Sequence, residues 1–115
     1  MRIFGLVSLL IVVAIIGLWV VKSLTSSSKS ENAPLQTEAI AKAKALYIQQ
    51  KSAGIDFSDG PCLSNDLLPA WVADIVHEPR QSADDLPQNQ CSAYLEGKAQ
   101  HFVELDVTGE LIQAK

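Results

Sequence analysis

The chain has 115 residues, 48% of them hydrophobic, and a formal net charge of −4. All thirteen acidic residues lie beyond position 30, and residues 35–115 hold twelve acids against six lysines and arginines. A segment this acidic lacks the basic footprint that nucleic acid or anionic lipid requires, so we exclude both as partners of that segment.

The first predicted element is an apolar run over residues 3–21, which begins at Ile3, ends at Val21 and contains no charged side chain. As an α-helix it would reach roughly 28 Å, close to the thickness of the hydrocarbon core of a bilayer. Trp19 lies near its end, where an indole sits well at the headgroup level. We expect residues 1–22 to be an uncleaved, single-pass anchor in the lipid bilayer; a cleaved signal peptide is the alternative, although the run is too long for one.

An amphipathic helix is expected after a tether. Residues 23–33 contain five serines and no apolar periodicity, which is typical of a flexible, solvated linker. Pro34 suits the first turn of a helix, and Gly54 suits the position just beyond its end. The apolar side chains between them recur at helical spacing and predict one core-facing side: Leu35, Ala39, Ile40, Ala43, Leu46 and Tyr47.

Cys62 and Cys91 are predicted to form a disulfide. Zinc sites usually draw their ligands in close pairs, whereas 28 residues separate these two cysteines and no histidine is adjacent to either. Closing such a loop stabilises a fold by roughly 3.6 kcal/mol in the chain-entropy estimate. Disulfides persist in oxidising compartments, so the predicted bridge and anchor together place residues 34–115 outside the cytoplasmic membrane. Two reduced cysteines in a cytoplasmic domain are the alternative.

Three strands are expected in the second half of the chain. Residues 71–77 are rich in β-branched and aromatic side chains, and Trp71 is expected to anchor the core. Residues 78–90 form a polar loop with two prolines. Residues 101–106 alternate, and a turn at Gly109 precedes a returning strand, which predicts a β-hairpin. The predicted fold of residues 34–115 is α+β, with one amphipathic helix packed on a small three-stranded antiparallel sheet.

Two histidines are the candidate metal ligands. His77 and His101 lie at the end and the start of predicted strands, and three carboxylates are nearby in sequence, Asp74, Glu104 and Asp106, so a metal site or an acid/base pair could be assembled from them. On neighbouring antiparallel strands the two imidazoles could meet, and one carboxylate would complete a metal site. No HExxH spacing supports this, so surface or structural histidines are the other interpretation.

No catalytic residue or cofactor is assigned. The serines lack a nucleophile elbow, and the glycines form no phosphate loop. Asp84 and Asp85 could bind calcium with Asp66 or Glu78, but the EF-hand pattern is absent, which favours a solvated loop. Arg80 is expected to pair with a neighbouring carboxylate.

Four segments carry a resemblance to known proteins: GPC at 60–62, WVADIVHEPR at 71–80, DDLPQNQC at 84–91 and HFVELD at 101–106. Together they resemble small bacterial membrane-anchored proteins of uncharacterised activity. That resemblance implies one N-terminal span and an exported disulfide-bearing domain, with no catalytic residues to transfer. The hairpin at 101–112 resembles the last hairpin of PepSY-type domains. The apolar start and disulfide-closed end are similar to type IV pilins, although no glutamate lies early in the apolar run.

Three functional hypotheses follow. The leading one is a non-enzymatic, membrane-anchored domain that faces the extracytoplasmic space and interacts with an envelope protein. The second is a small metal-binding or metal-dependent enzyme domain that uses His77 and His101. The third is a pilin-like filament subunit.

Overall fold

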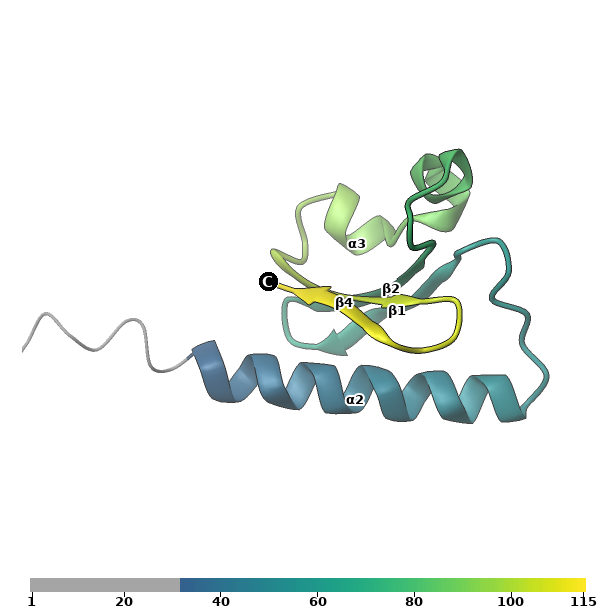
Figure 1. Ribbon diagram of the computed structural model, residues 1–115. Helices are drawn as coiled ribbons and strands as arrows, with labels where there is room; N and C mark the ends of the chain where they lie inside the picture. The colour runs from purple at the N-terminus through teal and green to yellow at the C-terminus, as the bar shows by residue number, and fades with distance from the viewer. Residues whose placement is uncertain (1–31) are drawn as a thin grey trace, which may run out of the picture. The chain divides into compact units, whose positions relative to one another are not determined.

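A computed structural model describes residues 32–115 (Figure 1). The predicted anchor, with Ile3, Trp19 and Val21, and most of the predicted tether lie outside the described residues. Within residues 32–115, no helix is both long enough and apolar enough to cross a membrane.

Helix α2 (Asn32–Ser52) confirms the predicted helix, and its buried residues are Ala39, Ala43 and Tyr47. It ends as the glycine predicts: Gly54 has a φ of 90°, and its N–H donates to the carbonyl of Lys51 at 3.0 Å. The next N–H, of Ile55, donates back to the carbonyl of Gln50 at 3.1 Å, which completes a Schellman cap. Leu35 departs from the predicted core-facing set, because it is 46% exposed.

The sheet has four strands in the order β1-β2-β3-β4, so the predicted count of three was wrong. They are β1 (Cys62–Leu68), β2 (Trp71–Val76), β3 (His101–Asp106) and β4 (Leu111–Ala114). The strand that the sequence did not predict is β1, which pairs with β2 through two register irregularities. The middle of β1 is polar, and β1 is a bulged edge strand in which buried and exposed residues do not alternate. The sequence therefore has no period-2 pattern from which β1 could be predicted.

The expected antiparallel sheet is only partly correct, because β2 and β3 run parallel. A parallel pair cannot be joined by a tight turn and needs a crossover connection. Here the crossover contains three short helical turns, η1 (Ser82–Asp85), η2 (Pro87–Asn89) and α3 (Ser92–Leu95). Figure 1 shows these turns on one side of the sheet and α2 along the other.

The two faces of the sheet therefore have separate apolar layers. Trp71, Ala73 and Ile75 from β2 face α2 with Val103 and Leu105 from β3, and the core there also contains Phe57 and three buried residues of the helix. The opposite face is thinner: Val72 packs there with Cys91, Ala99 and partly buried Phe102. Burial of Trp71 confirms its predicted role in the core.

Tyr47 joins the helix to the C-terminal hairpin. Its ring stacks on Phe57 with centroids 4.9 Å apart, and its hydroxyl donates to the carbonyl of Val107 at 2.8 Å. Gly109 lies in the predicted turn and adopts a left-handed conformation with a φ of 88°. A methyl group at Gly109 would lie 2.5 Å from the Tyr47 ring, so this position requires glycine for space as well as for backbone conformation.

The predicted disulfide between Cys62 and Cys91 is present. It links the first residue of the edge strand β1 to the start of α3. The bridge thereby holds the crossover against the sheet on the side away from α2.

Gly109→Ala is expected to lower the free energy of unfolding by about 3 kcal/mol, because it adds a collision with Tyr47 to the cost of a positive φ. Gly97→Ala is the matched control: Gly97 has a φ of 74°, but nothing lies within 4 Å of an added methyl group. The control should lose only about 1 kcal/mol. Urea denaturation of both variants measures the difference, and equal losses would contradict the proposed packing of Tyr47 on the turn.

Candidate functional site

A pocket of about 270 Å³ lies on the face of the sheet that the crossover covers. Its floor comes from β2 and β3, and its sides come from the crossover. Apolar and charged side chains share the lining: Val72, Asp74, Arg80, Gln90, Cys91, Tyr94, Leu95, Phe102 and Glu104.

Two carboxylates stand side by side in this pocket. Asp74 and Glu104 are register partners across the parallel β2–β3 pair, one row beyond the partners Val72 and Phe102. Adjacent strands lie roughly 4.8 Å apart, so two acids in register on one face are held close together. The parallel pairing thus places two like charges on one floor.

Asp74 is the electrostatically strained member of the pair. Its Oδ1 is buried and has no hydrogen-bond partner, and it is the only buried side-chain oxygen or nitrogen among residues 32–115 of which this is true. Burial, together with the negative charge of Glu104, raises the pKa of Asp74 to about 7. Near neutral pH this carboxyl group can therefore exist either protonated or ionised.

Glu104 is held by the protein. One of its oxygens accepts a hydrogen bond of 2.6 Å from the side-chain amide of Gln113, and the other lies 3.6 Å from the Arg80 guanidinium. Arg80 also donates to Asp85 at 3.0 and 3.1 Å, which confirms the expected pairing of this arginine with a neighbouring carboxylate. Because Asp85 already matches the charge of Arg80, the pocket keeps an excess of negative charge when Asp74 ionises.

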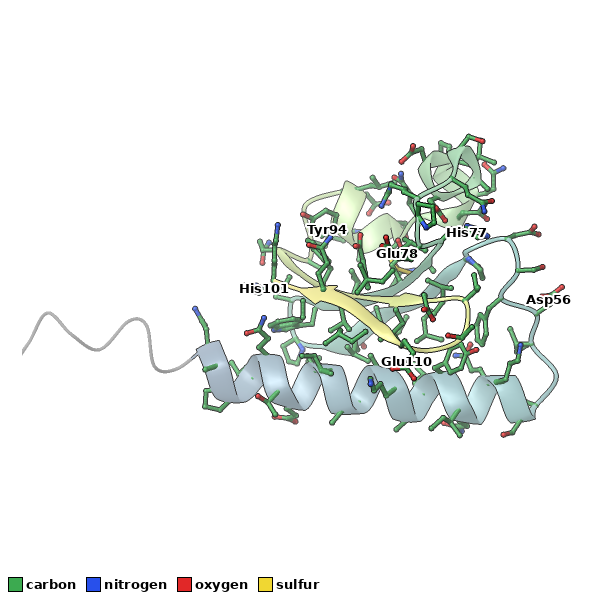
Figure 2. All side chains as sticks on the ribbon, viewed as in Figure 1. Asp56, His77, Glu78, Tyr94, His101 and Glu110 are labelled. Carbon is green, nitrogen blue, oxygen red and sulfur yellow. A yellow bond between two sulfur atoms is a disulfide. The ribbon has the colours of Figure 1, made fainter. Side chains whose placement is uncertain are left out.

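The rim of the pocket is apolar and exposed. Tyr94 is 43% exposed and Leu95 is 56% exposed. The Tyr94 ring meets Phe102 edge to face at 5.3 Å, and Figure 2 shows Tyr94 on the crossover side of the sheet. Large apolar side chains that are exposed to water beside half-buried carboxylates are typical of a binding surface.

The rim is anchored to the edge strand. The Oδ1 of Asn65 in β1 accepts hydrogen bonds from the Ala93 N–H at 2.9 Å and the Ser92 hydroxyl at 3.3 Å. The disulfide at Cys91 lies directly before them. Short helix α3 is therefore positioned by covalent and polar contacts rather than by a deep apolar core.

The structure does not bring His77 and His101 together. Trp71 is the register partner of His101, whereas His77 follows the last residue of β2, so the imidazoles lie at opposite ends of the parallel pair. At about 3.3 Å per residue the ends of such strands are roughly 20 Å apart, and Figure 2 shows the two labels far from each other. The candidate metal site required the two imidazoles to meet on neighbouring antiparallel strands, whereas β2 and β3 are parallel. Within residues 32–115 no group of three potential ligands could hold a metal ion.

Each histidine has a structural contact instead. His101 stacks on Trp71 with ring centroids 4.8 Å apart. The Nδ1 of His77 lies 2.9 Å from Asp84 Oδ1, and its Nε2 lies 2.8 Å from the carbonyl oxygen of Ser58. Both ring nitrogens face acceptors, so the doubly protonated imidazolium is the form that satisfies both contacts.

Asp84 is buried rather than solvated, which corrects the expectation for its loop: it is only 1% exposed. Its carboxylate accepts hydrogen bonds from the backbone N–H groups of His77 and Gln81 as well as from the His77 ring. Burial by itself raises the pKa of Asp84, but these hydrogen bonds together hold it below the usual value. The Asp84 hydrogen bond in turn raises the pKa of His77. This ion pair fastens the start of the crossover to the end of β2.

Sequence reasoning grouped Asp74 and Glu104 with the two histidines as carboxylates for a metal site or an acid/base pair, but it did not place the two acids beside each other. One signal was present: each acid is the single charged residue near the middle of a β-strand rich in apolar side chains. A lone acid in a strand that packs on both faces is a candidate for a perturbed, functional carboxylate. Only the parallel register showed that the two acids are neighbours.

Comparison with models of protein families, with curated proteins and with solved structures found no match to this chain. The resemblances to membrane-anchored bacterial proteins, PepSY-type hairpins and pilins stay predictions.

Asp74→Asn should be most beneficial to stability at high pH. In the wild type, a raised folded-state pKa means that the folded chain keeps a proton that the unfolded chain releases, so the free energy of unfolding falls as pH rises from 4 to 8. This one group should account for a fall on the order of 3 kcal/mol. Urea denaturation at several pH values measures the difference between variant and wild type. Asp66→Asn, at an exposed carboxylate outside the pocket, is the control; a difference for Asp74→Asn that stays constant with pH would contradict the assignment.

Asp84→Asn is expected to lower the free energy of unfolding by about 2 kcal/mol at pH 5 to 6, where Asp84 and His77 are both charged. The raised pKa of His77 means that its contribution is fully present below about pH 6.5 and disappears as pH rises through the folded-state value. The lowered pKa of Asp84 means that its contribution disappears as pH falls below about 4. Asp85→Asn removes only an exposed ion pair and should change stability by less than about 1 kcal/mol. Similar losses for the two variants in denaturation at pH 5.5 would disprove the special role of Asp84.

Proposed function

We propose that this chain is a single-pass, membrane-tethered interaction module that works outside the cytoplasmic membrane and binds an envelope protein through its pocket face. The apolar run at residues 3–21 supports the tether. The disulfide between Cys62 and Cys91 supports an oxidising compartment.

The observation that carries the binding role is the combination of an exposed apolar rim with a carboxylate that has one buried, unpartnered oxygen. Tyr94 and Leu95 offer apolar surface at the mouth, and the Oδ1 of Asp74 on the floor lacks a hydrogen-bond donor. Exposed aromatic side chains beside a desolvated polar group are characteristic of binding hot spots. A partner that supplied the missing donor would relieve the cost of the buried oxygen and cover the rim at the same time.

Binding accounts for the site better than catalysis does. A carboxyl group with a pKa near 7 is suited to general acid or base chemistry. However, both oxygens of the neighbouring Glu104 face protein donors, and Cys91, the sulfur in the lining, is held in the disulfide. Of the polar side chains in the lining, Asp74 is the one with a buried oxygen that lacks a hydrogen-bond partner, which suits recognition.

The test is site-specific photo-crosslinking of the full-length chain in intact cells. With p-benzoylphenylalanine in place of Leu95, we expect one crosslinked envelope protein, because this position lies on the rim of the pocket. The control carries the same group in place of Lys42, an exposed residue of α2. Equal crosslinking from both positions, or none from position 95, would refute a specific pocket-face interaction.

The compartment is tested in the same cells with a thiol reagent that does not cross the cytoplasmic membrane. Labelling of Cys62 and Cys91 should require prior reduction. Labelling without reduction would refute the oxidised, exported state, and labelling only after lysis would place the domain on the other side of the membrane.

A further inference from the structure

We propose that the pocket accepts a lysine side chain of the protein partner, with the ammonium group between Asp74 and Glu104 and the alkyl stem along the apolar wall. This inference rests on the proposed interaction function and names the chemical group that the site recognises.

Charge complementarity is the first argument. Asp74 and Glu104 form adjacent acids on the floor, and Arg80 at the side of the pocket is shared between Asp85 at 3.0 Å and Glu104 at 3.6 Å, so three acids face one base. A cation that enters therefore meets net negative charge. Residues 35–115 carry twice as many acids as bases, so the whole domain also attracts a basic partner.

The missing hydrogen bond is the second argument. The Oδ1 of Asp74 is buried and has no donor. An ammonium group has three N–H donors and no acceptor, so it can satisfy Asp74 and share a second bond with Glu104. A neutral apolar side chain in the same place would leave the Asp74 carboxylate without a donor and would also remove water from it, which is unfavourable.

The shape of the pocket is the third argument. Val72 and Phe102 lie one row from the acids, and Tyr94 meets Phe102 at the rim. A lysine stem of four carbons can pack along this wall while its charged end reaches the floor. The volume of about 270 Å³ equals that of roughly nine water molecules, which suits one side chain better than a large ligand.

Other cations fit less well. A calcium ion takes six to eight oxygen ligands, and no group of three acidic, histidine or cysteine side chains among residues 32–115 could hold a metal ion. An arginine would bring its planar fork beside Arg80, which already donates to Asp85 and approaches Glu104. A free small amine would be largely enclosed in its site, whereas Tyr94 and Leu95 leave this mouth open to a protein surface.

Binding of the ammonium group is expected to depend on pH. The groups that face Asp74 are Glu104, Arg80 and Asp84, and burial together with Glu104 raises the pKa of Asp74 to about 7. The lysine prefers the ionised carboxylate, so affinity should rise on the order of tenfold between pH 5.5 and pH 8.

The experiment is an NMR titration of the full-length chain in micelles of a neutral detergent. The probe is Nα-acetyl-lysine N-methylamide, and its matched neutral control is the norleucine compound, which has no ammonium group. Ring signals of Tyr94 and Phe102 report binding. We expect a Kd on the order of 1 mM for the lysine probe at pH 8 and at least tenfold weaker binding of the norleucine probe.

Variants separate charge recognition from apolar contact. Asp74→Asn and Glu104→Gln should each weaken the lysine probe by tenfold or more and leave the norleucine probe unchanged. Asp66→Asn, outside the pocket, should change neither. Because Asp74→Asn removes a strained acid, it is not expected to unfold the chain at pH 8.

The remaining outcomes decide between the two proposals. Equal affinity for the two probes, affinity that does not change with pH, or displacement of lysine by millimolar calcium would overturn the lysine site. If crosslinking from position 95 still captures one envelope protein, the interaction function stands and only the lysine inference fails. Loss of both the crosslink and probe binding removes both.

Discussion

The parallel pairing of β2 and β3 governs the rest of this structure. Two parallel neighbours cannot be connected by a hairpin, so residues 77–100 must cross from one end of the sheet to the other. Helix α2 already covers one face, and the crossover therefore covers the opposite one, as Figure 1 shows. Because the strands are parallel and in register, Asp74 and Glu104 become neighbours beneath the crossover. The pocket, its paired acids and the separation of the two histidines all follow from this one pairing.

The crossover has little apolar core of its own, and other contacts hold it. The helical turns η1, η2 and α3 are each only three or four residues long, too short to be stable through helix propensity. The disulfide, the Asn65 contacts to α3 and the Asp84–His77 ion pair fix the segment at its two ends. A small domain that lacks a second thick core commonly relies on such links. They leave Tyr94 and Leu95 exposed at fixed positions, which favours recognition because less conformational entropy is lost on binding.

Asp74 opposes the stability of the domain that contains it. A residue of similar size without charge would avoid the burial of an unpartnered oxygen and the repulsion from Glu104. Natural proteins violate such local rules mostly where activity needs the strained group. The ion pair between His77 and Asp84 behaves differently from Asp74. The buried carboxylate of Asp84 accepts several hydrogen bonds and stabilises the fold. One acid of the crossover face is thus satisfied within the chain, and the other is poised for a donor from outside.

The sequence by itself determined the helix, the C-terminal hairpin and the disulfide, because each depends on residue patterns that can be recognised without the fold. Helical periodicity and the glycine at 54 predicted α2 and its end. Alternation and Gly109 predicted the hairpin. The presence of two cysteines predicted the disulfide. Strand β1 had no such signal, because its polar middle lies on a bulged edge where burial does not alternate. Only the tertiary structure decided that β2 and β3 are parallel, since the choice of strand partner depends on contacts between residues distant in sequence. That choice separated the two candidate metal ligands, His77 and His101, and placed Asp74 beside Glu104 in the pocket.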